Sequence, residues 1–346
     1  MKKIVFILSF IFLFSGQAAV KAYDHFPGEE CGSNGRYDCD LRCVPEADIV
    51  NAQINDRCDY TAPVNLDCGA YNFDWGKCGS NIVTHRGYWW YDPSHPGTGV
   101  SIENFYGTLA VGLFMYYDDS HKPMWLSATC SEDNATSFSY SGNLFYWTGW
   151  PLGSSYYSPV PHKVGNISIA FSHSQADVTY TITEPGKWLD GGKIDHVGQA
   201  VTVHLKTFLP SIVSSDKKGS EMPINGWWWN PRLEGMGIFF EEYHQTGFMA
   251  WYHYGPDGLP RWYTCDGQLS PDQKVSGTTQ AVFTCNMREW TGGSSIGSAN
   301  YSAPTPVSLG TATLTFQRVA HLLPTATLVS PVGTYDLERF TLSRNK

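Results

Sequence analysis

The sequence contains an internal duplication, and this constrains the fold more than any other feature does. Most features of residues 90–125 return in residues 228–262. In both stretches Trp-x-x-Pro is followed by Gly-x-Gly, then by a glutamate (Glu103 or Glu241), and finally by Pro-x-Trp. The copies are 138 positions apart from the first proline to the glutamate and 137 apart at the closing Pro-x-Trp. Because chance would not hold such a register, we interpret the stretches as two copies of one domain.

Each copy has the pattern of short antiparallel strands. Aromatic and β-branched runs alternate with Gly, Pro, Asn and Asp, which is typical of strands joined by tight turns. No stretch has a sustained helical period. The duplication extends to 147–149 with 290–292 and to 165–171 with 310–316, so each copy is expected to be a domain of roughly 120 residues with about eight strands in sequential order. In the first copy we expect strands near 87–91, 100–105, 109–117, 124–129, 136–140, 143–148, 166–172, 177–183 and 200–208.

The predicted fold class is all-β. Closing a sheet on itself removes its edges, so we predict two tandem antiparallel meander β-barrels of the streptavidin or lipocalin kind, with a β-sandwich as second choice. A barrel of this size is either filled by side chains or holds one small ligand. The expected organisation is a signal peptide at 1–22, a cysteine-rich disulfide module at 23–84, β-domains at 85–209 and 225–346, and a linker at 210–224.

The N-terminus predicts export. A short basic region precedes the apolar run 4–14, and small or β-branched residues suit cleavage after Ala22. No cysteine directly follows that site, where Tyr23 is the next residue, so we expect a secreted or periplasmic protein and not a lipoprotein. Loss of Lys2, Lys3 and Lys21 with the leader changes the net charge from −9 to −12, which disfavours nucleic acid and polyanionic glycans as partners. No later apolar segment has the length of a transmembrane helix.

The N-terminal cysteines predict a disulfide framework formed in an oxidising compartment. Zinc is the rival interpretation, but no pair has the Cys-x-x-Cys spacing of structural zinc sites. The acidic residues of this module could hold calcium, but no Asp-x-Asp-x-Asp-Gly loop is present, and a solvated acidic face is preferred. The pairing stays open, because six cysteines allow fifteen arrangements. The six are Cys31, Cys39, Cys43, Cys58, Cys68 and Cys78.

Three further cysteines lie in the β-domains. We expect Cys265 and Cys285 to pair across neighbouring strands. In the first copy Cys130 lies near the position of Cys265, with Phe and Tyr where Cys285 would fall. Since nine cysteines cannot all pair, Cys130 is expected to stay free or to form a disulfide-linked dimer.

The aromatic residues are the candidate ligand-binding groups. Flat exposed aromatic surface beside Asn and Asp suits the apolar faces of sugar rings. The alternative is that these side chains fill and plug the barrels. The candidates are Trp90, Tyr91, Trp125, Trp227, Trp228, Trp229 and Trp262.

Glu103 and Glu241 are the candidate catalytic residues, because glycoside hydrolysis needs two carboxylates. The alternative is a glutamate that faces outward or is structurally paired. Arg339 is a candidate partner, although its counterpart in the first copy is Thr207. The histidines are scattered and His-Glu-x-x-His, Gly-x-Ser-x-Gly and phosphate-loop motifs are missing, so no metal and no cofactor are predicted.

The repeated signature resembles a repeat of many secreted proteins of Gram-negative bacteria, and this resemblance spans both β-domains. The half-motif Cys31-Gly32 to Cys39 is similar to short cysteine modules of secreted bacterial proteins. The repeat family has no established activity, so the resemblance implies an exported β-protein and transfers no catalytic residue.

Three functions remain open at this stage. The leading hypothesis is a non-catalytic secreted binding protein, such as an adhesin or surface-interaction factor, that engages a glycan or an extracellular protein with two-site avidity. The second is a hydrolase or lyase acting on a neutral polymer through Glu103 or Glu241. The third is a structural envelope protein with filled barrels.

Overall fold

The structure is a computed structural model. It describes residues 35–37 and 43–45 and, between 88 and 340, all residues except 106–107, 118–121, 135–138, 173–174, 185–196, 210–218, 221, 295–299 and 320–322. In the N-terminal module it describes the backbone of two paired strands, β1 (Gly35–Tyr37) and β2 (Cys43–Pro45). The predicted leader and the predicted pairing of the six N-terminal cysteines lie outside the described residues.

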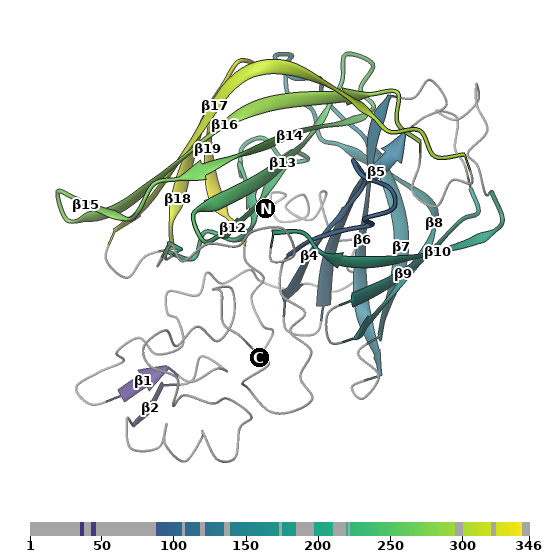
Figure 1. The fold of residues 1–346 in the computed structure, drawn as a ribbon, viewed down its shortest axis with the longest axis horizontal. Coiled ribbons are helices and arrows are strands. Elements are labelled where there is room, and N and C mark those ends of the chain that lie inside the picture. Colours follow the sequence, from purple (N-terminus) through teal and green to yellow (C-terminus); the bar gives the residue numbers. More distant parts are fainter. Residues whose placement is uncertain are drawn as a thin grey trace, which may run out of the picture.

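The first copy forms a closed antiparallel barrel, as predicted. Its strands follow one another around the barrel, and β10 returns to pair with β3. In Figure 1 this barrel has the blue to teal strands. The strands are β3 (Tyr88–Tyr91), β4 (Val100–Phe105), β5 (Thr108–Tyr117), β6 (Pro123–Asn134), β7 (Ser139–Thr148), β8 (Val160–Ser172), β9 (Gln175–Ile182) and β10 (Ala200–Thr207).

The second copy forms a barrel of the same order beside the first (Figure 1). It closes through β14 and β16, and the short β15 (Gln273–Val275) extends one edge of β16. No helix in the described part of the chain is long and apolar enough to cross a membrane. The remaining strands are β11 (Gly226–Trp229), β12 (Gly237–Tyr243), β13 (Thr246–Tyr254), β14 (Pro260–Leu269), β16 (Thr278–Thr291), β17 (Thr305–Val319), β18 (Thr325–Ser330) and β19 (Gly333–Arg339).

One strand prediction in the first copy was wrong. The segments 136–140 and 143–148 were expected to be two strands, but β7 runs without a break from Ser139 to Thr148. Gly142 falls between the two predicted strands; in the structure it lies inside β7, opposite Cys130. A Cβ atom at Gly142 would lie 2.1 Å from the carbonyl oxygen of Thr129. The glycine therefore permits a close approach of two backbones.

Apolar side chains occupy the interior of both barrels. Alternate residues of each strand point inward, and Trp90 of β3 packs on Phe171 at a ring-centroid distance of 5.6 Å. Trp228 and Phe316 make the equivalent contact in the second barrel at 5.2 Å. Met222 and Ile224, at the end of the predicted linker, are buried in the second core. Of the two kinds of small barrel considered, these interiors resemble the filled kind.

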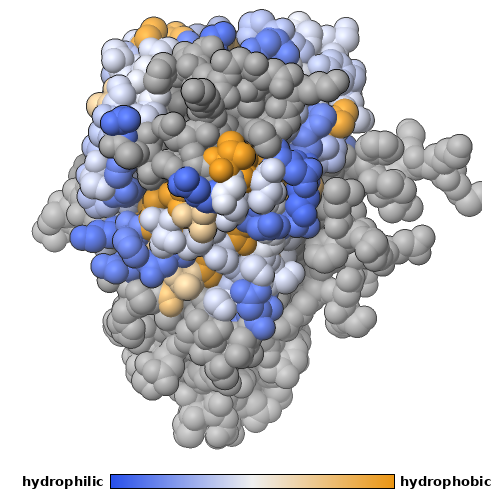
Figure 2. Space-filling model, turned by 90° about the vertical axis from the view of Figure 1, so that its right-hand side faces the viewer, coloured by the Kyte–Doolittle hydropathy of each residue, from blue (hydrophilic) through white to orange (hydrophobic). Residues whose placement is uncertain are grey.

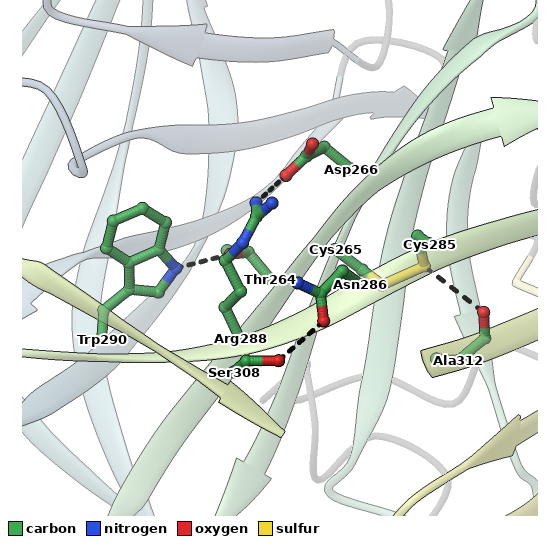
Figure 3. The surroundings of a disulfide bond; sticks show 9 residues. All are labelled: Thr264, Cys265, Asp266, Cys285, Asn286, Arg288, Trp290, Ser308 and Ala312. Atoms are coloured by element: carbon green, nitrogen blue, oxygen red, sulfur yellow. Dashed lines mark hydrogen bonds and ion pairs between the residues drawn. A yellow bond between two sulfur atoms is a disulfide. The ribbon is translucent and has the colours of Figure 1, made fainter. Parts of the chain in front are cut away.

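The predicted disulfide of the second barrel is confirmed. Cys265 of β14 and Cys285 of β16 are bonded, with their Cα atoms 5.5 Å apart (Figure 3). The link closes a 20-residue separation, for which chain entropy predicts a stabilisation of about 3 kcal/mol. Around it, Arg288 pairs with Asp266 and Ser308 donates to Asn286 at 2.9 Å on the outer face.

Cys130 is free in the structure, as one of the two expectations had it, but its counterpart in the second barrel is not Cys265. By strand register its counterpart is Gly267, and the counterparts of Cys265 and Cys285 are Ala128 and Gly142. Cys130 is free and has no exposed surface inside the first barrel. Burial raises the pKa of its thiol to about 12. A disulfide-linked dimer through Cys130 would therefore require the barrel to open.

The visible surface is largely polar. On the face in Figure 2 the described residues are mostly hydrophilic, and apolar residues form small, separated patches. Among the described residues the exposed large apolar side chains include several single valines and one adjacent aromatic pair, Tyr156 and Tyr157. That pair stands out because isolated surface valines are normal, whereas neighbouring exposed aromatics suggest a binding surface.

We predict that Gly142→Ala destabilises the first barrel. The added methyl group would push the backbones of β6 and β7 apart, and such overpacking costs about 1–3 kcal/mol. Asn143→Ala is the control, because Asn143 is an exposed neighbour on the same strand. Urea unfolding of both variants measures the effect; equal midpoints would contradict the close approach.

Candidate functional site at the junction of the two barrels

A third hydrophobic core lies between the barrels. Strand β4 turns Val100 and Ile102 into its own barrel, whereas Ser101 and Glu103 face the second barrel. Strand β12 is buried on both faces in the same way, which explains its almost continuous apolar sequence. We call this core the seam; its buried members are Trp89, Ala110, Trp125, Trp147, Trp150, Trp227, Met236, Phe239, Ala250, Tyr252, Tyr254, Trp262 and Phe340.

The two signature glutamates cross the seam reciprocally. Glu103 of the first barrel accepts a hydrogen bond from the backbone N–H of Trp227 at 2.7 Å. Glu241 of the second barrel accepts one from the backbone N–H of Trp89 at 2.6 Å. Trp89 and Trp227 are themselves equivalent positions, so the seam has an approximate twofold symmetry. Each barrel therefore supplies a donor and an acceptor that the other needs.

The closing tryptophans of the signature also bind across the seam. Trp125 donates its indole N–H to the carbonyl of His253 at 2.9 Å, and Trp262 donates to the carbonyl of Met124 at 3.0 Å. Tyr252 adds a hydroxyl contact to Ser101 at 2.9 Å. Buried aromatic groups with satisfied polar atoms make a rigid interface, so the two barrels form one body.

The two glutamates have different partners. Arg339 forms an ion pair with Glu103 and donates to the carbonyl of Trp227 at 2.8 Å. The guanidinium fits because Gly226 has no side chain: a Cβ there would lie 2.2 Å from Nη2 of Arg339. The first copy has Tyr88 at the position of Gly226 and Thr207 at that of Arg339. Glu241 accordingly has no cationic partner, and its Oε1 makes no hydrogen bond among the described residues.

This asymmetry appears in the acid–base behaviour of the seam. Burial raises the pKa of Glu241 well above its usual value, the Trp89 N–H only partly opposes this, and the neighbouring Glu242 adds to it. Burial also raises the pKa of Glu103, but Arg339 and the Trp227 N–H counteract the rise. His253 behaves in the opposite sense, because burial lowers its pKa to about 3.

The seam does not provide the catalytic geometry considered for the glutamates. Both side chains are enclosed between the barrels, with 6% and 0% exposure for Glu103 and Glu241. Each is bonded to the backbone of the opposite barrel, where no sugar polymer can reach it. Glu103 is instead a structurally paired glutamate, which was the alternative considered for it. Its partner across the seam is Arg339, the candidate named from the sequence.

The structure also relocates the candidate binding aromatics. Trp90 and Trp228 lie inside the barrels, and Trp125, Trp227 and Trp262 lie in the seam, all at most 4% exposed. The expectation that they form an exposed surface was therefore wrong. Tyr91 and Trp229 are half-buried, each against a phenylalanine of its own barrel.

Two loops extend the seam to the surface. We call residues 149–159 of the first barrel and, in the second, the described residues 292–294 and 300–304 the straps. Pro159 of the first strap lies on Gly235 in the other barrel, where a Cβ would be 2.0 Å from the proline ring. Pro304 of the second strap lies on Gly97, with an equivalent approach of 2.2 Å. Both glycines have a positive φ, 92° and 86°. The proline contacts show that the first glycine of each Gly-x-Gly signature is where the strap of the opposite barrel packs.

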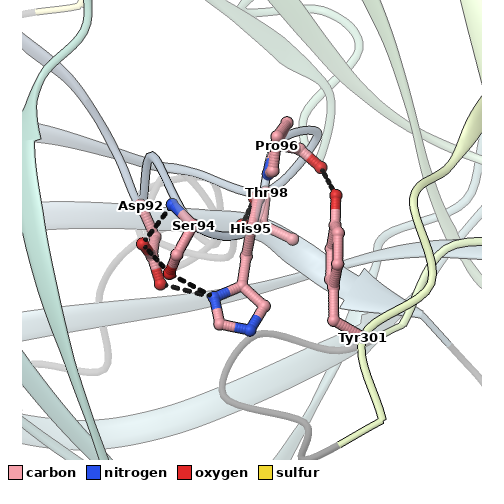
Figure 4. Close-up of polar contacts among 6 residues, drawn as sticks. All are labelled: Asp92, Ser94, His95, Pro96, Thr98 and Tyr301. Carbon is pink, nitrogen blue, oxygen red and sulfur yellow. Dashed lines mark hydrogen bonds and ion pairs between the residues drawn. The ribbon is translucent and has the colours of Figure 1, made fainter.

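The first junction, where the second strap meets the signature turn of the first barrel, is internally satisfied (Figure 4). Asp92 contacts His95 Nδ1 at 2.6 Å and accepts from the Ser94 hydroxyl at 2.6 Å. Tyr301 packs edge-on against His95 and donates to the carbonyl of Pro96 at 2.6 Å. Burial would raise the pKa of Asp92, but the bonds from Ser94 and His95 outweigh it and lower that pKa.

This Asp, Ser and His group is not a catalytic triad. Ser94 and Asp92 both contact the same ring nitrogen, Nδ1 of His95, whereas a triad places the serine and the acid on opposite nitrogens. Among the described residues, no group of three or more His, Cys, Asp or Glu side chains is arranged to hold a metal ion. We interpret the first junction as a structural turn.

The second junction exposes groups that its counterpart does not. The first strap carries Tyr156 and Tyr157, which are 39% and 50% exposed. Trp150 donates its indole N–H to the carbonyl of Glu234 at 3.3 Å and packs edge-on against Tyr156 at 5.8 Å. The hydroxyl of Tyr157 donates to the Gly149 carbonyl at 2.7 Å. We call Trp150, Tyr156, Tyr157 and Glu234, together with the buried Tyr254, the strap site.

Sequence analysis missed the residues of the strap site and also Trp89. Trp89 could have been found, because it precedes the signature by one position and keeps the same offset to Trp227. Tyr156 has a counterpart in Tyr301, but in sequence both lie in connections without a motif. Nothing local distinguishes an exposed tyrosine from a packed one.

Comparison with known proteins adds no identity: a scan against models of protein families finds no match, and a search of curated proteins finds no relative.

We predict opposite effects of one substitution at the two equivalent glutamates. Glu103→Gln leaves the buried Arg339 without a counter-charge and should cost about 3–5 kcal/mol. Glu241→Gln keeps an acceptor for the Trp89 N–H and removes an unpaired carboxylate, so stability at neutral pH should stay the same or rise. Thermal unfolding of both variants measures this. Arg339→Met added to Glu103→Gln should recover part of the loss, and equal losses at both glutamates would contradict the asymmetry.

Glu241 should also make stability depend on pH above its ordinary pKa of 4.5. Its raised pKa means that the folded state holds a proton that the unfolded state releases above its ordinary value of 4.5. Stability should therefore fall as pH rises, by up to about 1.4 kcal/mol per unit. His253 acts only below its ordinary value of 6.5, where stability falls as pH decreases. Urea midpoints of the native protein and Glu241→Gln from about pH 7 to 9 isolate the effect; parallel curves would refute it.

Proposed function

We propose that this protein is a secreted, non-catalytic binding protein that engages an extracellular glycan through the strap site. The observation that carries the proposal is the pair of adjacent exposed tyrosines, Tyr156 and Tyr157, held beside Glu234 on a rigid two-barrel body. Flat aromatic side chains offer a large apolar face to sugar rings at little cost in conformational entropy.

Export is part of the proposal. The predicted leader at 1–22 and the disulfide between Cys265 and Cys285 both support it, because structural disulfides persist in oxidising compartments. The net charge of −9 for the whole chain favours neutral or cationic ligands over polyanionic ones.

The structural envelope protein remains the second candidate. The filled barrel interiors and the extensive buried seam support it, because neither needs a ligand. The hydrolase alternative is not proposed, since its two glutamates are bonded within the seam. The binding protein and the structural envelope protein differ in one measurable respect, which is whether Tyr156 and Tyr157 bind a ligand.

A glycan array with the mature chain tests the proposal. Oligosaccharide binding is expected, without release of reducing ends, and Tyr156→Ala with Tyr157→Ala should weaken it about tenfold or more. Tyr301→Ala is the matched control, because Tyr301 is the counterpart of Tyr156 at the first junction. Absence of binding to any glycan would favour the structural envelope protein, and release of reducing ends would overturn the non-catalytic assignment.

A further inference from the structure

The carboxylate of Glu234 lacks a partner. It is half-buried in the signature turn of the second barrel, and burial raises its pKa. Its backbone carbonyl is held by Trp150, but within the described part of the chain its side chain makes no hydrogen bond and no ion pair. A partly desolvated carboxylate of this kind gains most from a donor that carries positive charge.

The aromatic side of the strap site is fixed in place. Trp150 supports Tyr156 from below and the Gly149 carbonyl holds the hydroxyl of Tyr157, so both rings are positioned without a ligand. The negative charge of Glu234 acts on Tyr156, whose pKa is raised chiefly by burial and further by that carboxylate. Tyrosine faces attract ammonium groups as well as apolar surface.

A second orphan group lies beneath the strap. Tyr254 is 1% exposed and its hydroxyl has no hydrogen-bond partner among the described residues. Its ring lies against Gly149, where a Cβ would be 2.3 Å from it, and the carbonyl of that glycine binds the Tyr157 hydroxyl. Its pKa is raised chiefly by burial and further by Tyr156 and Tyr157. A buried hydroxyl without a partner is costly, so the packing beneath the strap is not optimised for the free protein alone.

From this arrangement we infer that the strap site recognises an amino sugar with a free amine, whose ammonium group binds Glu234 while the sugar ring lies on Tyr156 and Tyr157. The inference rests on the proposed glycan binding and names its substrate class. A lysine side chain would satisfy the carboxylate, but its thin alkyl chain cannot cover two rings.

The first junction predicts a stoichiometry of one. At the position of Glu234 it has Pro96, whose carbonyl already binds the hydroxyl of Tyr301. Its own carboxylate, Asp92, is saturated by Ser94 and His95. We therefore expect a single site per chain, since among the described residues of the two junctions only Glu234 is a carboxylate without a polar partner.

Calorimetry with the mature chain and three tetrasaccharides tests the inference: β-1,4-linked glucosamine, its N-acetylated form and a β-1,4-glucan. We expect one site per chain and at least tenfold tighter binding of the free-amine tetramer. Glu234→Gln should abolish that preference while the thermal unfolding midpoint changes little, because the change is isosteric and the side chain has no hydrogen bond or ion pair within the described part of the chain. Tyr301→Ala should bind as the native protein does.

The outcomes distinguish a failure of the amino-sugar inference from a failure of the proposed glycan binding. Equal binding of all three sugars, or a preference that survives Glu234→Gln, would overturn the amino-sugar assignment and leave glycan binding intact. A lysine-rich peptide that binds as tightly as the glucosamine tetramer and depends on Glu234 would also overturn it. If none of the sugars binds, the glycan proposal itself fails for these sugars and the amino-sugar inference falls with it.

Discussion

The reciprocal hydrogen bonds of Glu103 and Glu241 are the constraint on which the rest of this structure depends. Each carboxylate reaches out of its own barrel and accepts a backbone N–H from the other barrel. In a water-excluded core an unmet N–H or carboxylate is expensive, so each barrel satisfies a group that the other cannot satisfy alone. The tryptophans around them exclude water, which makes these bonds necessary as well as strong.

The repeated signature can be understood from this seam. Its glutamate binds the opposite backbone, its closing tryptophan donates across the interface, and its Gly-x-Gly leaves room for the opposite strap. Each copy of the motif thus forms one half of the same interface, and equivalent residues of the two copies make equivalent contacts, as in an isologous interface. The symmetry is broken where the copies differ: Gly226 admits the guanidinium of Arg339, whereas Tyr88 and Thr207 occupy the equivalent places. As a result Glu103 is paired with Arg339, whereas burial raises the pKa of Glu241 and favours its protonated form.

The fold was predictable because strand periodicity and duplication act over many residues. Two sequential barrels, the absence of helix in the described residues and the pairing of Cys265 with Cys285 followed from pattern alone. The break predicted near Gly142 was wrong, because sequence does not distinguish a turn glycine from one that lets two backbones approach. The site was less predictable for a related reason: an outward-facing tryptophan on a strand is exposed in an isolated barrel and buried in a paired one. Sequence could not show that the outer faces of β4 and β12 meet.

Burial of the signature aromatics changes where function can lie. If these tryptophans hold the barrels together, they are unavailable to a ligand, and recognition must use what the seam leaves at its ends. The two junctions provide an internal comparison there. At the first, Asp92, His95 and Tyr301 satisfy one another and their neighbours. At the second, the Tyr254 hydroxyl has no hydrogen-bond partner among the described residues, and the half-buried Glu234 lies near two exposed rings. Folding normally satisfies buried polar groups, and this difference between two equivalent places is why we propose the second junction, and not the first, as the ligand site.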